Sequence, residues 1–137
     1  MGLTYAEIVL KNCGDVLKAQ RYEMDEDEVR SMRVNALVDT GSISLCINEA
    51  IQEVLQLPIR GKKLSQMANG QLLEFPVVGP VEIYIDDRYC TTNAILLPDD
   101  QEPLLGAIPL EEMDMMVHPS RNKLVPAHPE GPIMKLK

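Results

Sequence analysis

Asp39 stands in the sequence context that most strongly suggests chemistry. It follows the apolar run Ala36-Leu37-Val38 and precedes Thr40-Gly41-Ser42, and an alternating apolar pattern resumes at Ile43. This arrangement predicts a tight loop between two buried strands, with a carboxylate at the end of the first strand. A charged side chain so close to core residues is unfavourable unless something compensates it. A functional requirement is one reason for its presence.

The neighbours of Asp39 indicate what the loop could do. The Thr40 hydroxyl can bond backbone groups, and Gly41 allows a positive φ or the close approach of a second chain. Two such loops facing each other would place two carboxylates about 3 Å apart, where both cannot be ionised at once. One could then activate water as a general base while its protonated partner bonds a peptide carbonyl. The chain has one Asp-Thr-Gly sequence, so this chemistry needs a second copy.

A simpler interpretation of Asp39 is a turn residue that bonds its own loop, as in the common Asx turn. Taken alone, the residue would favour this interpretation. Asp86, Asp87, Asp99 and Asp100 also fall in turn-like segments, and none of them is followed by Thr-Gly. They are poor candidates for a second catalytic carboxylate within the same chain.

Composition and charge exclude several other classes of function. The chain has 137 residues, the size of one ordinary domain. Its net charge of −8 argues against binding to nucleic acid or to an anionic membrane. Much of that charge falls in residues 23–28, which we interpret as a solvated loop. We expect no membrane-spanning segment and a cytoplasmic location.

Metal and disulfide chemistry have no support in the sequence. Cys13, Cys46 and Cys90 are widely spaced, odd in number, and form no CxxC motif. We predict that Cys46 and Cys90 are buried in strands, in a reducing compartment. His118 and His128 stand beside prolines and are expected to be exposed. The sequence therefore predicts no metal site and no cofactor.

The hydrophobic pattern predicts mostly β structure. The expected strands cover residues 3–10, 16–22, 29–38, 43–47, 64–68, 71–75, 77–85, 89–97, 115–117 and 123–125. Asn69-Gly70 is the strongest short-range hairpin signal. Asn48 can cap one short helix, and Pro109 can begin another. From Pro126 onward, prolines and a glycine predict a loose tail.

Three of these features together resemble the retropepsin-like, single-lobed aspartic proteases. The first is Leu37-Val38-Asp39-Thr40-Gly41-Ser42, the second is the hairpin around Asn69-Gly70, and the third is Leu104-Leu105-Gly106 with a helical turn after it. Asp-Thr-Gly alone is a weak motif, but the combination is specific. The resemblance spans residues 3–125. The segments Leu110-Glu111-Glu112-Met113 and Val117-His118-Pro119 resemble bacterial members more than retroviral ones.

The resemblance implies a fold and a set of site residues. The implied fold is a closed antiparallel β-barrel with one or two short helices, in a domain of residues 1–125 followed by a proline-rich tail of residues 126–137. The implied catalytic residue is Asp39, and the implied scaffold of its loop consists of Thr40, Gly41, Ser42 and Gly106. The implied substrate-covering flap consists of Met67, Ala68, Asn69, Gly70 and Gln71.

The implied activity is that of an aspartic endopeptidase. Asp39 from each subunit of a homodimer would activate water to hydrolyse a peptide or protein substrate. The alternative is a catalytically silent peptide-binding or dimerisation module built on the same fold. Two positions depart from retroviral members, which usually carry Ala in place of Ser42 and have a flap tip richer in glycine than residues 67–71.

Overall fold

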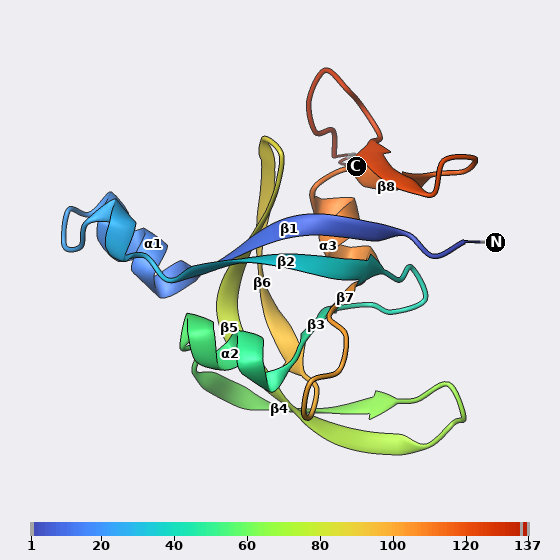
Figure 1. Cartoon of the computed structure of the whole chain (residues 1–137), viewed down its shortest axis with the longest axis horizontal. Coiled ribbons are helices and arrows are strands. Elements are labelled where there is room, and N and C mark those ends of the chain that lie inside the picture. Colours follow the sequence, from blue (N-terminus) through green and yellow to red (C-terminus); the bar gives the residue numbers. More distant parts are fainter. Residues whose placement is uncertain (1, 135, 137) are drawn as a thin grey trace.

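The computed structural model describes residues 2–134 and 136. These residues form a mostly β structure (Figure 1). Its elements are β1 (Tyr5–Asn12), α1 (Cys13–Gln20), η1 (Glu26–Glu28), β2 (Ser31–Val38), β3 (Leu45–Ile47), α2 (Glu49–Leu55), β4 (Ile59–Gln66), β5 (Leu72–Ile85), β6 (Arg88–Leu96), β7 (Leu104–Leu105), α3 (Ala107–Glu112), β8 (Met115–His118) and β9 (Lys123–Pro126).

Seven strands form one sheet in the order β1-β2-β7-β3-β6-β5-β4, and β8 pairs with β9 in a second, two-stranded sheet. β1 also pairs with β5, so the large sheet curls back toward itself. Most pairings are antiparallel, as predicted, but β7 runs parallel to β2 and β3 runs parallel to β6. The short strand β7 lies between β2 and β3. It runs parallel to β2 and antiparallel to β3. A strand inserted between two opposed strands must be parallel to one of them.

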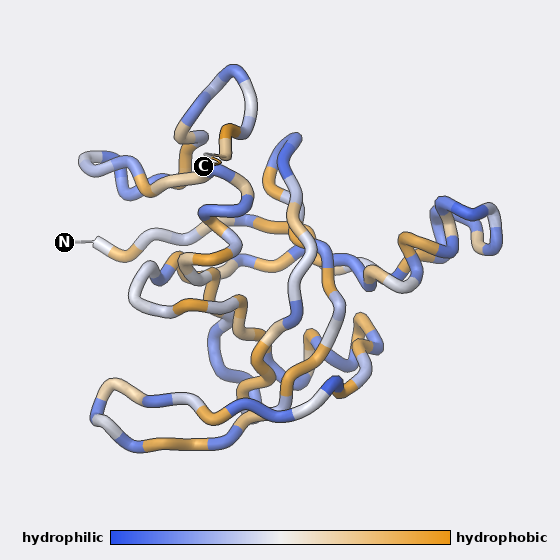
Figure 2. The backbone as a smooth tube through the Cα atoms, turned by 180° about the vertical axis from the view of Figure 1, so that it is seen from behind, coloured by the Kyte–Doolittle hydropathy of each residue, from blue (hydrophilic) through white to orange (hydrophobic). Residues whose placement is uncertain are grey.

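The core is built from aliphatic side chains that alternate along the strands. In β1 the inward residues are Ala6, Ile8 and Leu10, and in β2 they are Val34 and Ala36. This period of two follows from the pleat of a strand, which points successive side chains to opposite faces. The turn that follows α1 is mostly hydrophilic and projects away from the sheet (Figure 2). Residues 23–28 lie there, mostly exposed, as predicted.

The prediction of a strand at residues 16–22 is wrong, because this segment belongs to the helix α1 and the turn after it. Asn12 caps the helix, with its side chain accepting a hydrogen bond from the Asp15 backbone N–H at 3.1 Å. The buried Asp15 carboxylate in turn bonds the Arg30 Nε at 2.8 Å. The bond to Arg30 lowers the pKa of Asp15 below its ordinary value. An N-cap and an ion pair from the buried Asp15 to the exposed Arg30 therefore outweigh the apolar alternation of the segment.

The other predicted elements are confirmed with small changes. The Asn48 side chain caps α2 by accepting a bond from the Ile51 N–H at 3.0 Å, and the hairpin around Asn69-Gly70 forms between β4 and β5. β5 continues through Pro76 as one strand where two were expected. The described residues form three α-helices instead of one or two, α1 being the addition. None of their helices combines the length and apolar character needed to cross a membrane.

The segment after β9, predicted to be a loose tail, is anchored through Asp114. The Asp114 carbonyl accepts a hydrogen bond from the Ala127 N–H at 2.8 Å. The Asp114 carboxylate contacts His128 Nδ1 at 2.6 Å and accepts a bond from the Ile133 N–H at 3.2 Å. The bond to His128 lowers the pKa of Asp114. The buried guanidinium of Arg88 also donates to the His128 carbonyl, so residues 127–133 lie against the domain.

Candidate active site

The loop that carries Asp39 is a tight turn stabilised by its own backbone. Asp39 Oδ1 accepts a hydrogen bond from the Gly41 N–H at 3.0 Å, and the Asp39 carbonyl accepts one from the Ser42 N–H at 3.0 Å. The first bond is that of an Asx turn. Among the described residues, the hydrogen bonds of this carboxylate involve Oδ1 alone. The second oxygen of Asp39 is therefore available to water or to another molecule.

The short strand β7 fixes the loop from the side. The Asp39 N–H donates to the Leu105 carbonyl at 3.0 Å, and Leu105 lies opposite Val38 in the parallel pairing with β2. Beyond the strand, the Ala107 N–H donates to the Ser42 carbonyl at 2.8 Å. The loop is thus bonded at both ends to one segment that comes from far along the chain. Its conformation is set by these tertiary contacts and by the Gly41 N–H bond, and Gly41 does not adopt a positive φ.

Gly106 sits where the two segments cross. A Cβ atom there would meet the carbonyl carbon of Ile43 at 2.7 Å and its oxygen at 2.8 Å, and would contact the Ser44 oxygen as well. These are backbone atoms, which cannot rotate away as a flexible side chain can. The close approach of residues 104–106 to the Asp39 loop therefore requires glycine at this position. The scaffold role predicted for Gly106 has a clear steric basis.

The predicted flap is the tip of the β4–β5 hairpin. The Met67 N–H donates to the Gln71 carbonyl at 2.8 Å, and the Gly70 N–H donates back to the Met67 carbonyl at 2.8 Å. The Asn69 side chain accepts a bond from the Gln71 N–H at 2.9 Å, and Gly70 has φ of 84°. The tip therefore closes with the residue types that such turns need. It projects to the same side of the molecule as the Asp39 loop (Figure 1).

A groove with a volume of about 930 Å³ lies between the Asp39 loop and the flap. Of the residues predicted for the site, the groove is lined by Asp39, Gly41, Ser42, Met67, Ala68 and Gly70. The other predicted residues, Thr40, Asn69, Gln71 and Gly106, lie outside the lining. Asn69 and Gln71 bond to each other in the hairpin tip, Gly106 packs against Ile43, and Thr40 belongs to the Asp39 loop without lining the groove. The structure thus brings the two predicted segments to one groove.

The walls of the groove also include residues that were not predicted to be site residues. They are Ile43, Ser44, Cys46, Lys63, Leu64, Ser65, Gln66, Phe75, Ile95, Leu97 and Leu104. Ile43 was expected to continue the buried pattern of the following strand, but it is 69% exposed. The strand β3 begins only at Leu45, so Ile43 belongs to the loop and faces the groove. The alternation of apolar and polar residues along a strand cannot show whether Ile43 lies in the core or at the groove.

Cys46 is the other potentially reactive side chain in the lining. It is buried, and burial together with the negative charge of Asp39 raises its pKa to about 11. A thiol with this pKa stays protonated near neutral pH and is a poor nucleophile. The predicted burial of Cys46 and Cys90 is confirmed, and Cys13 is buried as well. Within residues 2–134 and 136, no cluster of three or more His, Cys, Asp or Glu residues could hold a metal ion.

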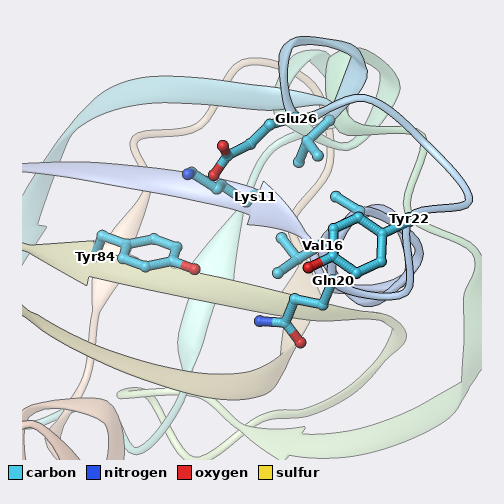
Figure 3. Close-up of a pocket in the computed structure, with 8 residues that line it drawn as sticks. Lys11, Val16, Gln20, Tyr22, Glu26 and Tyr84 are labelled. Carbon is cyan, nitrogen blue, oxygen red and sulfur yellow. The ribbon is translucent and has the colours of Figure 1, made fainter.

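A second, smaller cavity of about 420 Å³ lies beside α1 (Figure 3). The strand residues Lys11 and Tyr84 form one side of it, and Gln20 and Tyr22 lie on the other. Burial and a hydrogen bond to the buried Glu82 carboxylate raise the pKa of Tyr84. The phenol therefore stays protonated at physiological pH. The lining also includes Glu26, from the acidic segment after α1.

Comparison with known proteins supports the fold assignment. No family model matches the chain, and no curated protein matches it. Among solved structures, it is similar to the crystal structure of the retroviral protease-like domain of Ddi1 from Leishmania major, with a TM-score of 0.55 and 14% sequence identity. The match covers 91% of this chain and 88% of that one. At this level of identity the similarity concerns the fold alone, and it shows that the chain has a retropepsin-like fold.

Proposed function

We propose that this protein is an aspartic endopeptidase that works as a homodimer, with Asp39 of each subunit in the catalytic pair. The observation that carries the proposal is the groove, because the Asp39 loop and the flap hairpin line it together. These two segments are about thirty residues apart in the sequence. Their convergence within a retropepsin-like fold is the arrangement that peptide hydrolysis by paired carboxylates would need.

The requirement for a second subunit follows from the acidic groups in the groove. Of its described lining residues, Asp39 alone carries a carboxylate. The shared-proton mechanism needs two, so the other must come from a second chain. In a two-fold symmetric dimer the same loop faces its own copy, which would bring the two Asp39 side chains together near the axis.

In this mechanism the dimer holds one proton between two Asp39 carboxylates. The ionised member removes a proton from water as the water attacks the scissile carbonyl carbon, and the protonated member gives its proton to the carbonyl oxygen. The C–N bond then breaks as the pair returns a proton to the leaving amine nitrogen and takes one back from the hydroxyl of the intermediate, which leaves a carboxylic acid and one proton on the pair. The Gly41 N–H fixes Oδ1 of Asp39, which orients the carboxylate and leaves Oδ2 to the reaction. The flap, residues 67–71, would pair with an extended peptide as an added strand.

Other parts of the proposal rest on the sequence. A cytoplasmic location fits three free, buried cysteines, since a reducing compartment keeps thiols unpaired. A protease domain of residues 1–125 followed by a tail of residues 126–137 is part of the proposal, and Ala127, His128 and Ile133 of that tail are bonded to Asp114. The closer resemblance to bacterial members rests on the segments after Gly106.

The dependence of cleavage on pH tests the proposed chemistry. We expect kcat/KM on a library of apolar peptides to give a bell-shaped profile with a maximum at mildly acidic pH, because activity requires one proton on the pair. Activity falls at higher pH, where both carboxylates ionise, and at lower pH, where both are protonated. A rate that rises steadily through neutral pH would contradict the proposal. A protein that binds the peptides without cleaving them at any pH would instead be the silent module.

A further inference from the structure

The register of the flap hairpin assigns its two lysines to opposite faces. Lys63 lies opposite Phe75 in the antiparallel pairing of β4 and β5, and Lys62 lies opposite Pro76. Residues directly opposite each other share a face, and successive residues alternate between faces. Phe75 lines the groove, whereas Pro76 does not. The side chain of Lys63 therefore belongs to the face toward the groove, and that of Lys62 to the outer face.

The salt bridges agree with this assignment. Lys62 Nζ lies 3.8 Å from Glu74 Oε1, and neither Lys62 nor Glu74 lines the groove. Among the described residues, no ion pair joins Lys63 to an acidic side chain. One lysine of the hairpin is thus matched by an acid of the same face, and the other is not.

The groove is otherwise poor in charge. Of its described lining residues only two are charged, Asp39 and Lys63, and most of the others are apolar or small polar residues. An ammonium group on the wall of such a groove attracts an anionic group of a bound peptide, and the bond is charge-assisted. Near Asp39 an acidic side chain would be repelled. An acid should therefore be accepted at one position along the peptide, away from the bond that is cleaved.

We propose that Lys63 is a specificity-determining residue, which selects peptide substrates carrying a Glu or Asp side chain at one position removed from the scissile bond. This inference rests on the proposed function, because it assumes that the groove binds an extended peptide. The net charge of −8 opposes acidic peptides in general. The preference is consequently confined to a single position and does not extend to acidic peptides as a class.

The test uses Asp39→Asn protein, which holds peptide without turning it over, and a fluorescent octapeptide library with apolar residues. Each position carries either Glu or its neutral isostere Gln, and binding is measured by fluorescence anisotropy. We expect Glu at one position to tighten binding about two- to fivefold over Gln at low salt. The difference should shrink at about 0.5 M salt, because screening weakens a solvent-accessible ion pair.

Two substitutions in the same background separate the roles of the lysines. Lys63→Gln should remove the preference for Glu, and Lys63→Glu should replace it by a preference for Lys or Arg at the same position. The matched control is Lys62→Gln, on the same strand but facing outward, which should leave the preference unchanged. Equal binding of Glu and Gln peptides at every position would overturn the proposal. So would a Glu preference that survives Lys63→Gln.

The design separates failure of this inference from failure of the proposed function. Wild-type protein that binds Glu peptides preferentially but cleaves none of them would refute the endopeptidase and support the role of Lys63. Wild-type protein that cleaves the library with no preference for Glu at any position would support the endopeptidase and refute the role of Lys63. A groove that binds no peptide of the library would overturn the inference as well.

Discussion

Asp39→Asn should lower kcat/KM for peptide cleavage by about 10³-fold or more. The amide can neither accept the proton of the attacking water as a base nor hold the shared proton of the pair. It preserves the shape of the side chain, and its oxygen can still accept the Gly41 N–H bond that closes the loop. Stability toward urea should therefore stay close to that of the wild type. The measurement is cleavage of a fluorogenic peptide at mildly acidic pH.

The matched control is Asp86→Asn. Asp86 is an exposed aspartate in the β5–β6 turn, with φ of 53°, a conformation that Asn also tolerates. The substitution changes the net charge by the same amount as Asp39→Asn, but it lies outside the groove. This variant should cleave at the wild-type rate. Cleavage that persists in Asp39→Asn at the level of Asp86→Asn would remove Asp39 from the mechanism.

Gly106→Ala should lower the free energy of unfolding by about 3 kcal/mol, at the upper end of the usual effect of overpacking. The added Cβ would lie 2.7 Å from the carbonyl carbon of Ile43, so the backbone must move. Because the Asp39 loop continues into Ile43, the movement should displace the loop and reduce cleavage as well. Urea unfolding, monitored by circular dichroism, measures the loss of stability.

Gly14→Ala provides the comparison. Gly14 lies in α1, and its added Cβ would meet the Asn12 Oδ1 atom at 3.2 Å, a milder contact with a side chain. Alanine also favours the helix. We expect the change in unfolding free energy to stay within about 1 kcal/mol. If Gly106→Ala were as mild as Gly14→Ala, the crossing of residues 104–106 and the loop would not be the tight contact described above.

The parts of the site that depend on local residue types were predictable from the sequence. An Asp-Thr-Gly turn after an apolar strand and an Asn-Gly hairpin each involve neighbouring residues whose backbone preferences act at short range. The structure contains both turns, at Asp39 and at Asn69-Gly70. The scaffold role of Gly106 was implied by resemblance and has a steric reason in the crossing with Ile43.

The groove walls and the parallel pairings were not predictable in the same way. Three of the wall residues are as apolar as core residues: Phe75, Ile95 and Leu97. Only the arrangement of distant strands places them at the groove and not in the core. The parallel pairing of β7 with β2 joins segments more than sixty residues apart. Such pairings depend on the topology of the sheet, and the periodicity of a single strand does not reveal which strands pair.

The helix α1 and the docked tail show two further limits. The sequence contained the Asn12 cap, but an apolar alternation through residues 16–22 favoured a strand. The bond from the buried Asp15 to Arg30, which lies fifteen residues away, favours the helix. Asp114 binds His128 and Ile133 from the other side of the β8–β9 hairpin. A proline-rich composition predicts weak internal structure, but it carries no information about such long-range anchors.

The central claim is that one active site needs Asp39 from two subunits, and mixing the wild type with Asp39→Asn tests it most directly. The two proteins are allowed to exchange subunits at fixed total concentration, and cleavage is measured as the wild-type fraction decreases. Because only dimers with two aspartates would be active, activity should follow the square of that fraction, falling to about a quarter in an equal mixture. Activity that falls only to about half, in proportion to the wild-type fraction, would contradict the account.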